Sequence, residues 1–574
     1  MKRSLLVISV LLSFLVLGAG AGPANAAKVK VNLTQVGQKK LINKKFLRVK
    51  VRSARKGKIK VRGFSATFDK RERFSPLTRI ARPKFRRKGQ VRVVKLRLTP
   101  AGVKAVKRCE DRDIRAHAGA RRSAVKAMIR QTAGCAPKQI DLSRSDRCEF
   151  IAAPSPSVCM NPFPSNRYTK ADPSTETGRR INFRADAMPV NDDGIPIDPA
   201  PYAESDGFSQ GQTLLVRVPG LDNPEALART NPPNLTNPDR YSAPNTPIVV
   251  INTSTGQRHP IWVEIDSTTS LPQFSMVMIH PLVNFDPATR YVVAMRNLRD
   301  SAGTVLKAPE GFRYYRDVLP TGKAAINQRR SHFEDMFKRL RNRGIKRAGL
   351  YLAWDFTTAS DENNSVRALS MRDQGFATLG DENLADRQIQ GSAPQFTVDS
   401  VEENVNSQVA RRIKGSFEVP CYLKHDSSPQ GCAPGATMNL GGTGLPVQNG
   451  TWTANFECIV PHAIVNRPAT PGPDDPAADR LGRALVYGHG LMGSIAGEIN
   501  ATGQRMLGAK GFVVCGTDEI GMSTPDIQPV VQALMNLSGF PKVADRLQQG
   551  LLNEMFLTRL MIHPEGLVSK AAFR

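Results

Sequence analysis

This 574-residue sequence lacks the patterns that most often hold a metal ion. It contains no Cys-x-x-Cys pair, and its eight histidines are scattered without the spacing of zinc ligands. After residue 17 it also lacks any apolar segment of the roughly 20 residues that a transmembrane helix needs. We therefore expect no metal centre, no other cofactor, and a mature protein without a membrane span.

Acidic residues are scarce in one part of the chain. Residues 28–147 hold 38 Lys and Arg but only 7 Asp and Glu, and this region accounts for the excess behind the net charge of +31. Three interpretations stay open: a solvated face that keeps the protein soluble, retention on an anionic cell envelope, or nucleic-acid binding. The region lacks the interleaved aromatic residues of a stacking platform, so nucleic acid is the least favoured partner.

The N-terminus is typical of a secretory signal. Residues 2–3 are basic, residues 5–17 form an apolar core, and residues 24–26 read Ala-Asn-Ala, a typical cleavage site. The apolar core is shorter than the ~20 residues of a membrane span. We expect residues 1–26 to be removed after Ala26, which leaves the mature protein secreted or at the cell surface.

Cysteines in an exported chain are expected to form disulfides rather than metal sites. Cys148 and Cys159 enclose a loop that contains Pro and Ser, and Cys421 and Cys432 enclose a polar loop with Pro and Gly. Both pairs are typical of local cross-links.

Apolar and basic residues alternate in residues 47–52, 58–62 and 94–98. Period-two alternation places one face of a sheet in a core and loads the other with cations. We expect an immunoglobulin-like (Ig-like) β module over residues 27–98, followed by a linker and ordered loop region over residues 99–212.

Further β-rich runs separated by Pro, Asn, Gly and Asp predict a second β-sandwich-like region over residues 213–316, followed by a helical and mixed spacer over residues 317–394. Residues 207–211 match Gly-x-Ser-x-Gly, but they follow a Pro-rich loop and precede a strand. A nucleophile elbow needs a strand before it and a helix after it. We therefore interpret Ser209 as part of a turn.

Residues 395–574 follow a different order, with three strands, a helix, a fourth strand and a long helical stretch. The third strand ends in a glycine-rich turn, Gly488-His489-Gly490-Leu491-Met492-Gly493. Glycines let the backbone turn sharply and aim N–H groups at a developing negative charge.

This turn, together with Gly516-Thr517-Asp518 after the next strand, resembles secreted bacterial α/β-hydrolases of the lipase/esterase type. More closely, the chain is similar to large actinobacterial exported proteins that join Ig-like regions to such a hydrolase. The resemblance implies a multidomain fold, with N-terminal β-sandwich (Ig-like) modules followed by the N-terminal half of an α/β-hydrolase domain over residues 395–574. The function it implies is that of an exported serine esterase or lipase acting on acyl esters.

The same resemblance implies roles for the residues of the turn. The N–H groups of Gly490 and Leu491 would bind the oxyanion, with Gly488, His489 and Gly493 supporting the loop. In the hydrolase strand order the second and fourth strands are neighbours, so Cys458 and Cys515 are a further disulfide candidate.

No catalytic residue is assigned within the printed sequence. No Gly-x-Ser-x-Gly follows the glycine turn. We expect the nucleophile, acid and base beyond Arg574, with the serine turn within roughly fifty codons, and no triad-based activity in the chain as given.

Two other interpretations of the turn stay open. Gly488-x-Gly490-x-x-Gly493 matches the dinucleotide fingerprint, with Asp518 near the place of the ribose-binding acid. Two strands precede the motif, whereas the fingerprint usually follows the first, so we favour the hydrolase. The turn could also be purely structural, in a non-catalytic cell-envelope-binding protein with Ig-like modules.

Overall fold

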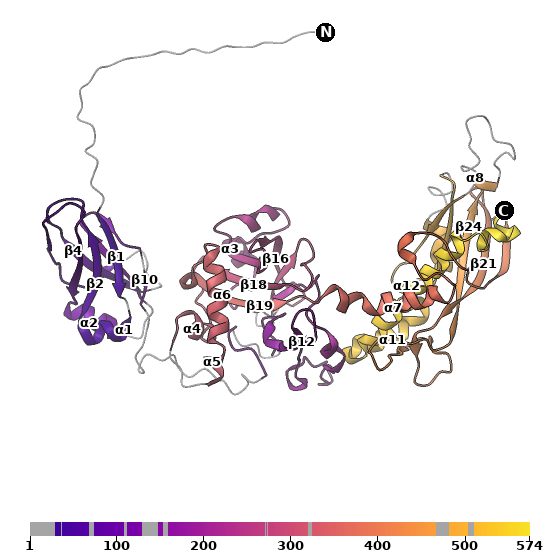
Figure 1. Cartoon of the computed structure of the whole chain (residues 1–574), viewed down its shortest axis with the longest axis horizontal. Helices are drawn as coiled ribbons and strands as arrows, with labels where there is room; N and C mark the ends of the chain where they lie inside the picture. The colour runs from indigo at the N-terminus through magenta and orange to yellow at the C-terminus, as the bar shows by residue number, and fades with distance from the viewer. Residues whose placement is uncertain are drawn as a thin grey trace, which may run out of the picture. The chain divides into compact units, whose positions relative to one another are not determined.

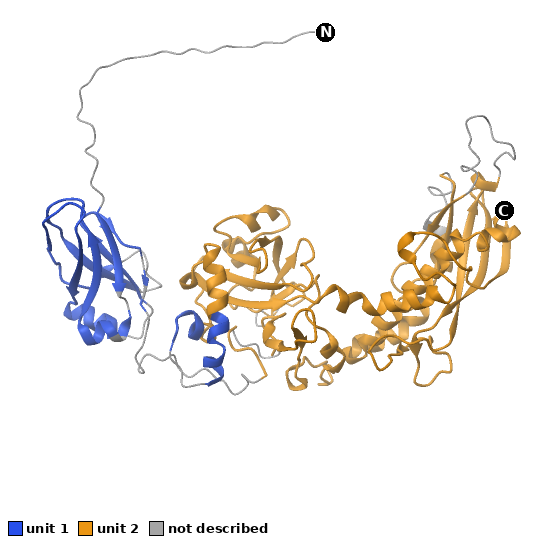
Figure 2. Cartoon of the chain, in the orientation of Figure 1, with its two compact units in different colours: residues 1–140, 313–333 blue, residues 141–312, 334–574 orange. Residues whose placement is uncertain are grey.

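The computed structural model describes residues 29–35, 37–67, 74–107, 112–124, 126–128, 147–152, 159–269, 271, 274–319, 324–465, 482–502 and 510–574. The chain is sheet-rich and multidomain, with several small antiparallel sheets and few helices (Figure 1). It divides into two compact units, residues 1–140 with 313–333 and residues 141–312 with 334–574 (Figure 2). The expected signal segment, residues 1–26, lies outside the described residues.

Two antiparallel sheets form the N-terminal module, which we define as the described part of residues 29–128. One sheet has the order β1-β2-β7 and the other β10-β8-β4-β5, with β9 beside β8 and a small β3-β6 pair. The elements are β1 Lys30–Gln35, α1 Gln38–Lys44, β2 Phe46–Arg52, β3 Gly57–Lys58, β4 Val61–Thr67, β5 Ser75–Pro76, β6 Lys84–Phe85, β7 Val91–Arg97, α2 Pro100–Lys107, β8 Arg112–Ala118, β9 Arg121–Arg122 and β10 Lys126–Ala127.

The alternating pattern of this module places its apolar residues in the core. Leu47, Val49 and Val51 of β2 are fully buried, while the basic residues between them face outward. The module continues beyond residue 98, where the sequence predicts a linker, because β8 pairs with β4 over the whole length of both strands. The inward side chains of β8 include Ala116 and Ala118, which are too small to give a strong apolar signal.

The next region also consists of antiparallel sheets, with the orders β13-β17-β16 and β15-β14-β18-β19. Their strands are β13 Leu214–Val216, β14 Ile248–Asn252, β15 Arg258–His259, β16 Ile261–Ile265, β17 Val277–Pro281, β18 Arg290–Arg296 and β19 Leu350–Thr357. The last strand, β19, lies within the spacer predicted over residues 317–394, yet it pairs along β18. The small pair β11 Thr169–Ala171 and β12 Arg179–Ile181 precedes this region.

The helices of the middle of the chain are short except for two. They are α3 Pro224–Thr230, α4 Glu310–Arg316, α5 Ala324–Gln328, α6 Arg330–Asn342 and α7 Asp361–Ala377. Ser360 caps α7, because its side chain accepts a hydrogen bond from the Asn363 N–H.

Residues 396–574 build a five-stranded mixed sheet with the order β20-β21-β24-β26-β25. The strand β24 is antiparallel to both of its neighbours, whereas β25 and β26 are parallel to each other. The elements are β20 Phe396–Glu403, β21 Val409–Pro420, β22 Leu423–Lys424, β23 Thr437–Met438, β24 Thr451–Pro461, α8 His462–Val465, β25 Arg483–Val486, α9 Ile495–Thr502, β26 Phe512–Thr517, α11 Ile527–Met535 and α12 Phe540–Ile562.

Helices cover both faces of this sheet. On one face Cys458 and Cys515 belong to a core with Leu552, Phe556 and other residues of α12, which is yellow in Figure 1. On the other face, Ile459 and Val514 pack with Ile495 and Ile499 of α9. Because successive residues of a strand point to opposite faces, neighbouring residues of β24 and β26 contribute to different cores.

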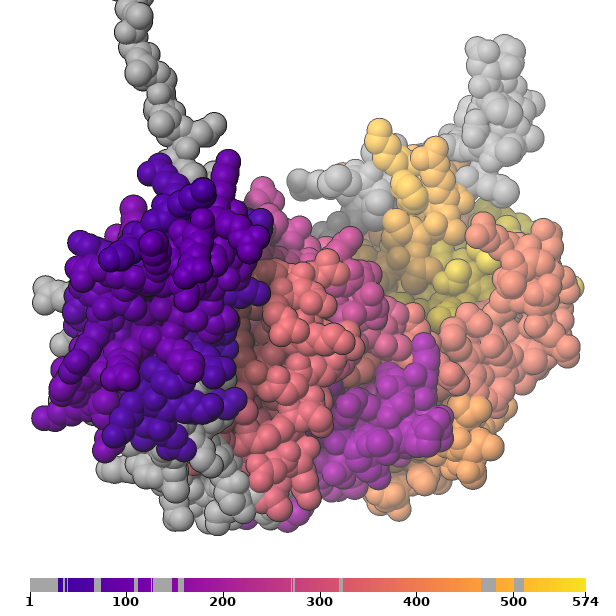
Figure 3. Space-filling model, turned by 60° about the vertical axis from the view of Figure 1, so that its left-hand side comes forward, coloured from indigo at the N-terminus to yellow at the C-terminus, as the bar shows by residue number. Residues whose placement is uncertain are grey.

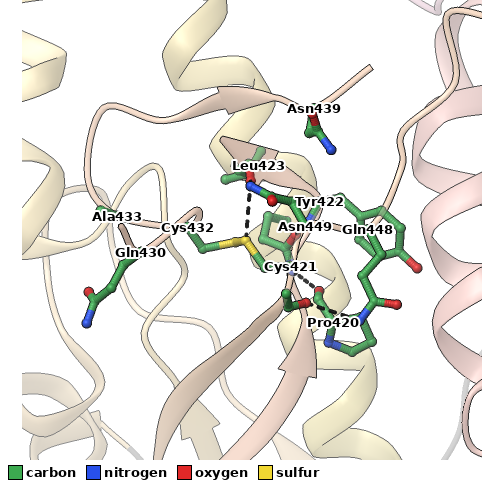
Figure 4. Close-up of a disulfide and its surroundings, with 12 residues drawn as sticks. Pro420, Cys421, Tyr422, Leu423, Gln430, Cys432, Ala433, Asn439, Gln448 and Asn449 are labelled. Atoms are coloured by element: carbon green, nitrogen blue, oxygen red, sulfur yellow. Dashed lines mark hydrogen bonds between the residues drawn. A yellow bond between two sulfur atoms is a disulfide. The ribbon is translucent and has the colours of Figure 1, made fainter. Parts of the chain in front are cut away.

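Three disulfides cross-link the described residues. They join Cys148 to Cys159, Cys421 to Cys432 and Cys458 to Cys515, with Cα–Cα distances of 4.7, 6.0 and 4.1 Å. The second closes the loop that leaves β21 (Figure 4), and the third joins β24 to β26. Disulfides persist in oxidising compartments, so the three bonds are consistent with a secreted protein. Among the residues that the structure describes, every helix is too short or too polar to cross a bilayer.

Candidate functional site

The glycine turn lies at the carboxyl end of the parallel pair β25 and β26. The loop after β25 is bound to the loop after β26, because the Met492 N–H donates to the Met522 carbonyl at 2.7 Å and the Thr524 N–H donates to the Gly493 carbonyl at 2.8 Å. Ligands of α/β sheets bind outside the carboxyl ends of the strands. The two joined loops are therefore the candidate site.

The turn is crowded around two of its glycines, although the nearest atom at each is the end of a flexible glutamate side chain. A Cβ atom on Gly493 would lie 2.2 Å from an oxygen of Glu498, and one on Gly488 would lie 2.3 Å from an oxygen of Glu519. Between them, Met492 adopts a left-handed backbone conformation, with φ of 61°. Non-glycine residues in that conformation cluster at functional turns.

His489 fastens the loop through both ring nitrogens. It is buried, its Nε2 accepts a hydrogen bond from the Glu519 N–H at 2.9 Å, and its Nδ1 lies 2.8 Å from the Gly490 carbonyl oxygen. Since Nε2 accepts, Nδ1 carries the proton and donates to that carbonyl. A ring held in this way supports the loop and is not available as a general base.

The sequence predicts that the Gly490 N–H binds the oxyanion. In the structure this N–H already has a partner. It donates to both carboxylate oxygens of Glu498 at 2.9 Å, and the Tyr487 hydroxyl donates to one of them at 3.1 Å. The Leu491 N–H, by contrast, donates no hydrogen bond to any described residue. Its side chain is 76% exposed, so Leu491 lies at the solvent surface of the turn.

Three glutamates of this site were not predicted from the sequence. Glu498 comes from α9, Glu519 from the loop after β26 and Glu554 from α12. Glu519 and Glu554 lie beneath Gly488, where a Cβ atom would approach both of their carboxyl groups. No local signal marks these residues, because they come from three separate segments of the chain.

The Glu554 carboxyl, beside Glu519, keeps its proton to an unusually high pH. Burial and the neighbouring Glu519 carboxylate raise the pKa of Glu554 to about 7 from its ordinary value of 4.5. A carboxyl with a raised pKa stabilises the folded chain below its unfolded pKa and loses that contribution as the pH rises through its folded pKa. The contribution of Glu554 is therefore present below pH 4.5 and lost above about pH 7.

Glu554→Gln is expected to unfold at a higher temperature than the unsubstituted chain at about pH 8, because it removes a charge that repels Glu519. The difference should shrink towards about pH 5, where the Glu554 carboxyl is largely protonated. Thermal denaturation over this pH range measures it. The matched control is Glu565→Gln, an exposed position, which should show no such trend. A Glu554→Gln difference that does not vary with pH would contradict the raised pKa of Glu554.

Asp518, the residue that would bind ribose in a dinucleotide site, accepts a hydrogen bond from the start of the helix α9 instead. Its Oδ1 accepts a hydrogen bond from the Ile495 N–H at 2.9 Å, at the start of α9. A dinucleotide would place its pyrophosphate at that helix start. The Asp518 carboxylate occupies this position and would repel a phosphate, so the arrangement disfavours dinucleotide binding.

Ser209 lies far along the chain from the glycine turn, in a turn of its own. Ser209 is exposed in the turn before the strand β13, and its hydroxyl accepts a hydrogen bond from the Gly211 N–H at 3.2 Å. Within the described ranges, no three His, Cys, Asp or Glu side chains are grouped so that they would hold a metal ion.

Comparisons with protein-family models, with curated proteins and with solved structures find no match to this chain.

Proposed function

We propose that this chain supplies the first strands and the oxyanion-binding turn of an exported α/β-hydrolase that cleaves acyl esters. The strand order carries the proposal. If β21 is counted as the first strand, then β24, β25 and β26 are the second, third and fourth along the chain. In the sheet they lie in the order first, second, fourth, third, and the second strand, β24, runs antiparallel to both of its neighbours. This is the arrangement of the resembled hydrolases, in which the second and fourth strands are neighbours.

The position of the turn adds support. In α/β-hydrolases the oxyanion is held by one N–H from the loop after the third strand and by the N–H of the residue after the nucleophile. The loop after β25 offers the Leu491 N–H for the first of these. Its neighbour Gly490 uses its own N–H to fix the loop on Glu498, and His489 fixes it on Glu519. The Leu491 N–H is thus preorganised without needing a partner in the resting protein.

The nucleophile would reach the site from the free side of β25. Among the described residues β25 pairs with β26 alone, so its other edge can accept a further strand. A serine on the turn after such a strand would stand beside the carboxyl end of β25, where Leu491 lies. We use the term assembled hydrolase for this chain together with the strand that bears the serine.

An ester assay tests the proposal. The purified chain is expected to hydrolyse a p-nitrophenyl acyl ester no faster than buffer. Adding the polypeptide translated downstream of codon 574 is expected to give turnover, and replacing its elbow serine with alanine should abolish it. Ser209→Ala is the matched control and should leave turnover unchanged. Turnover by the chain alone that Ser209→Ala removes would overturn the assignment.

The N-terminal module supports a second candidate function. We propose that its two antiparallel sheets form an Ig-like sandwich that binds the cell envelope, because one of its outer faces is densely cationic. If the downstream DNA encodes no serine elbow and the ester assay stays flat, binding rather than catalysis is the better account of the whole chain.

A further inference from the structure

The outer surface of the sheet β1-β2-β7 carries a regular array of cations. Side chains of β2 that alternate with the buried core residues point outward, and the register places outward residues of β1 and β7 directly opposite them. We call this surface the cationic face. Its basic members are Lys30, Arg48, Lys50, Arg52, Lys95 and Arg97.

Nothing in the described part of the module neutralises the cationic face. None of its six cations forms an ion pair with a described residue, and the only described carboxylate in residues 29–128 is Asp113, which is buried. Arg48 stands opposite Lys95, and Arg52 stands opposite Lys30. Like charges directly opposite each other destabilise a sheet, so a bound anionic surface would relieve a cost built into this module.

Apolar side chains lie among these cations. Val91 and Val93 are 46% and 58% exposed, and they stand opposite Arg52 and Lys50 on the same face. Phe46 lies at one end of the face. Its ring centroid is 5.7 Å from Arg48 Cζ and 5.5 Å from Lys95 Nζ. A soluble polyanion needs only the charges, whereas a bilayer surface offers headgroup phosphates for the cations and an apolar boundary for the valines.

We propose that the cationic face docks the protein on a bilayer that contains anionic phospholipids. The lysine and arginine side chains bind headgroup phosphates, and their aliphatic stems and the two valines lie at the boundary with the acyl chains. The described residues of the module belong to one of the two compact units and are drawn in indigo and violet in Figure 3. This proposal rests on the envelope-binding function proposed above for the module and names its partner. It is independent of the ester hydrolase, since none of that site belongs to this module.

Vesicle co-sedimentation of the whole mature chain tests the proposal. The chain is expected to bind vesicles of phosphatidylcholine mixed with phosphatidylglycerol, and to bind pure phosphatidylcholine vesicles far more weakly. Lys50→Gln, Lys95→Gln and Arg97→Gln combined should weaken binding about 100-fold, because each cation near an anionic surface is worth about fivefold. The matched control, Lys40→Gln, Lys104→Gln and Lys107→Gln, removes the same charge from α1 and α2 and should retain most of the binding.

The valines distinguish a bilayer from a soluble polyanion. Val91→Thr combined with Val93→Thr keeps the charge and the branched shape, and it is expected to weaken vesicle binding about tenfold through the loss of two apolar methyl groups. Equal losses in both triple variants would show that net charge alone drives binding and would overturn the cationic face. Unchanged vesicle binding by the threonine variant, with full competition by polyphosphate, would overturn the bilayer as the partner.

Discussion

Leu491→Pro is expected to lower the ester turnover of the assembled hydrolase about 100- to 1000-fold, the usual cost of removing one oxyanion donor. Proline has no N–H, so the substitution deletes the donor that the loop after β25 offers. Leu491 is 76% exposed, and the Gly493 N–H donates to the Gly490 carbonyl, so Leu491 occupies the second position of a β-turn, where proline is favoured.

The matched control for this experiment is Leu491→Ala. It removes the same exposed side chain but keeps the N–H, and it should retain turnover within a few-fold of the unsubstituted enzyme. Because the oxyanion forms only as the serine attacks, the loss in Leu491→Pro should appear in kcat and leave KM nearly unchanged. Equal losses in both variants would show that the leucine side chain, and not the N–H, matters.

Most of the order of elements in residues 395–574 is predictable, because most of these elements have a local signal. Apolar runs predict β21, β24 and β26, and the helical period predicts α12. The strand β20 has no such signal, since most of its residues are exposed at the edge of the sheet and only one side of its backbone is paired. Edge strands need little apolar surface, so their sequences resemble loops.

The site itself is predictable only in part. The glycines that permit a tight turn are recognisable in the local sequence, and so is the apolar strand that precedes them. Glu498, which accepts the hydrogen bond from the Gly490 N–H, is not recognisable in this way, because in the sequence it looks like any charged residue of a helix. Glu554 lies 66 positions beyond Gly488, and only the packing of α12 beside β25 and β26 brings its carboxyl group beneath the turn.

A buried ion pair fixes the loop on which this site depends. Arg546 of α12 donates to Asp526 at 2.6 Å, and both side chains are almost fully buried. Arg546 also donates to the carbonyl oxygens of Cys432 and Ala433 at 2.6 Å, beside the disulfide shown in Figure 4. The other oxygen of Asp526 accepts hydrogen bonds from the Gly521 N–H and the Ser523 hydroxyl, so the pair holds the loop after β26 in place.

Arg546→Met is therefore expected to lower the free energy of unfolding of this sheet by about 3–5 kcal/mol, because it leaves the Asp526 carboxylate buried without its cation. Hydrogen exchange of peptides from β24 and β26 measures the change within this domain. Lys542→Met is the matched control, since Lys542 is an exposed residue of the same helix, and it should change the value by less than about 0.5 kcal/mol.

Because Asp526 and Arg546 form one ion pair, the effects of substituting them on the free energy of unfolding should not be additive. Asp526→Asn and Arg546→Met disturb the same bonds, so their combined cost should fall short of the sum of the separate costs by about 0.5–3 kcal/mol. Ser523 forms a bridge with Gly493, so either single substitution should also increase exchange of the amides in the glycine turn. Additive costs, together with unchanged protection of that turn, would show that the ion pair does not support the site.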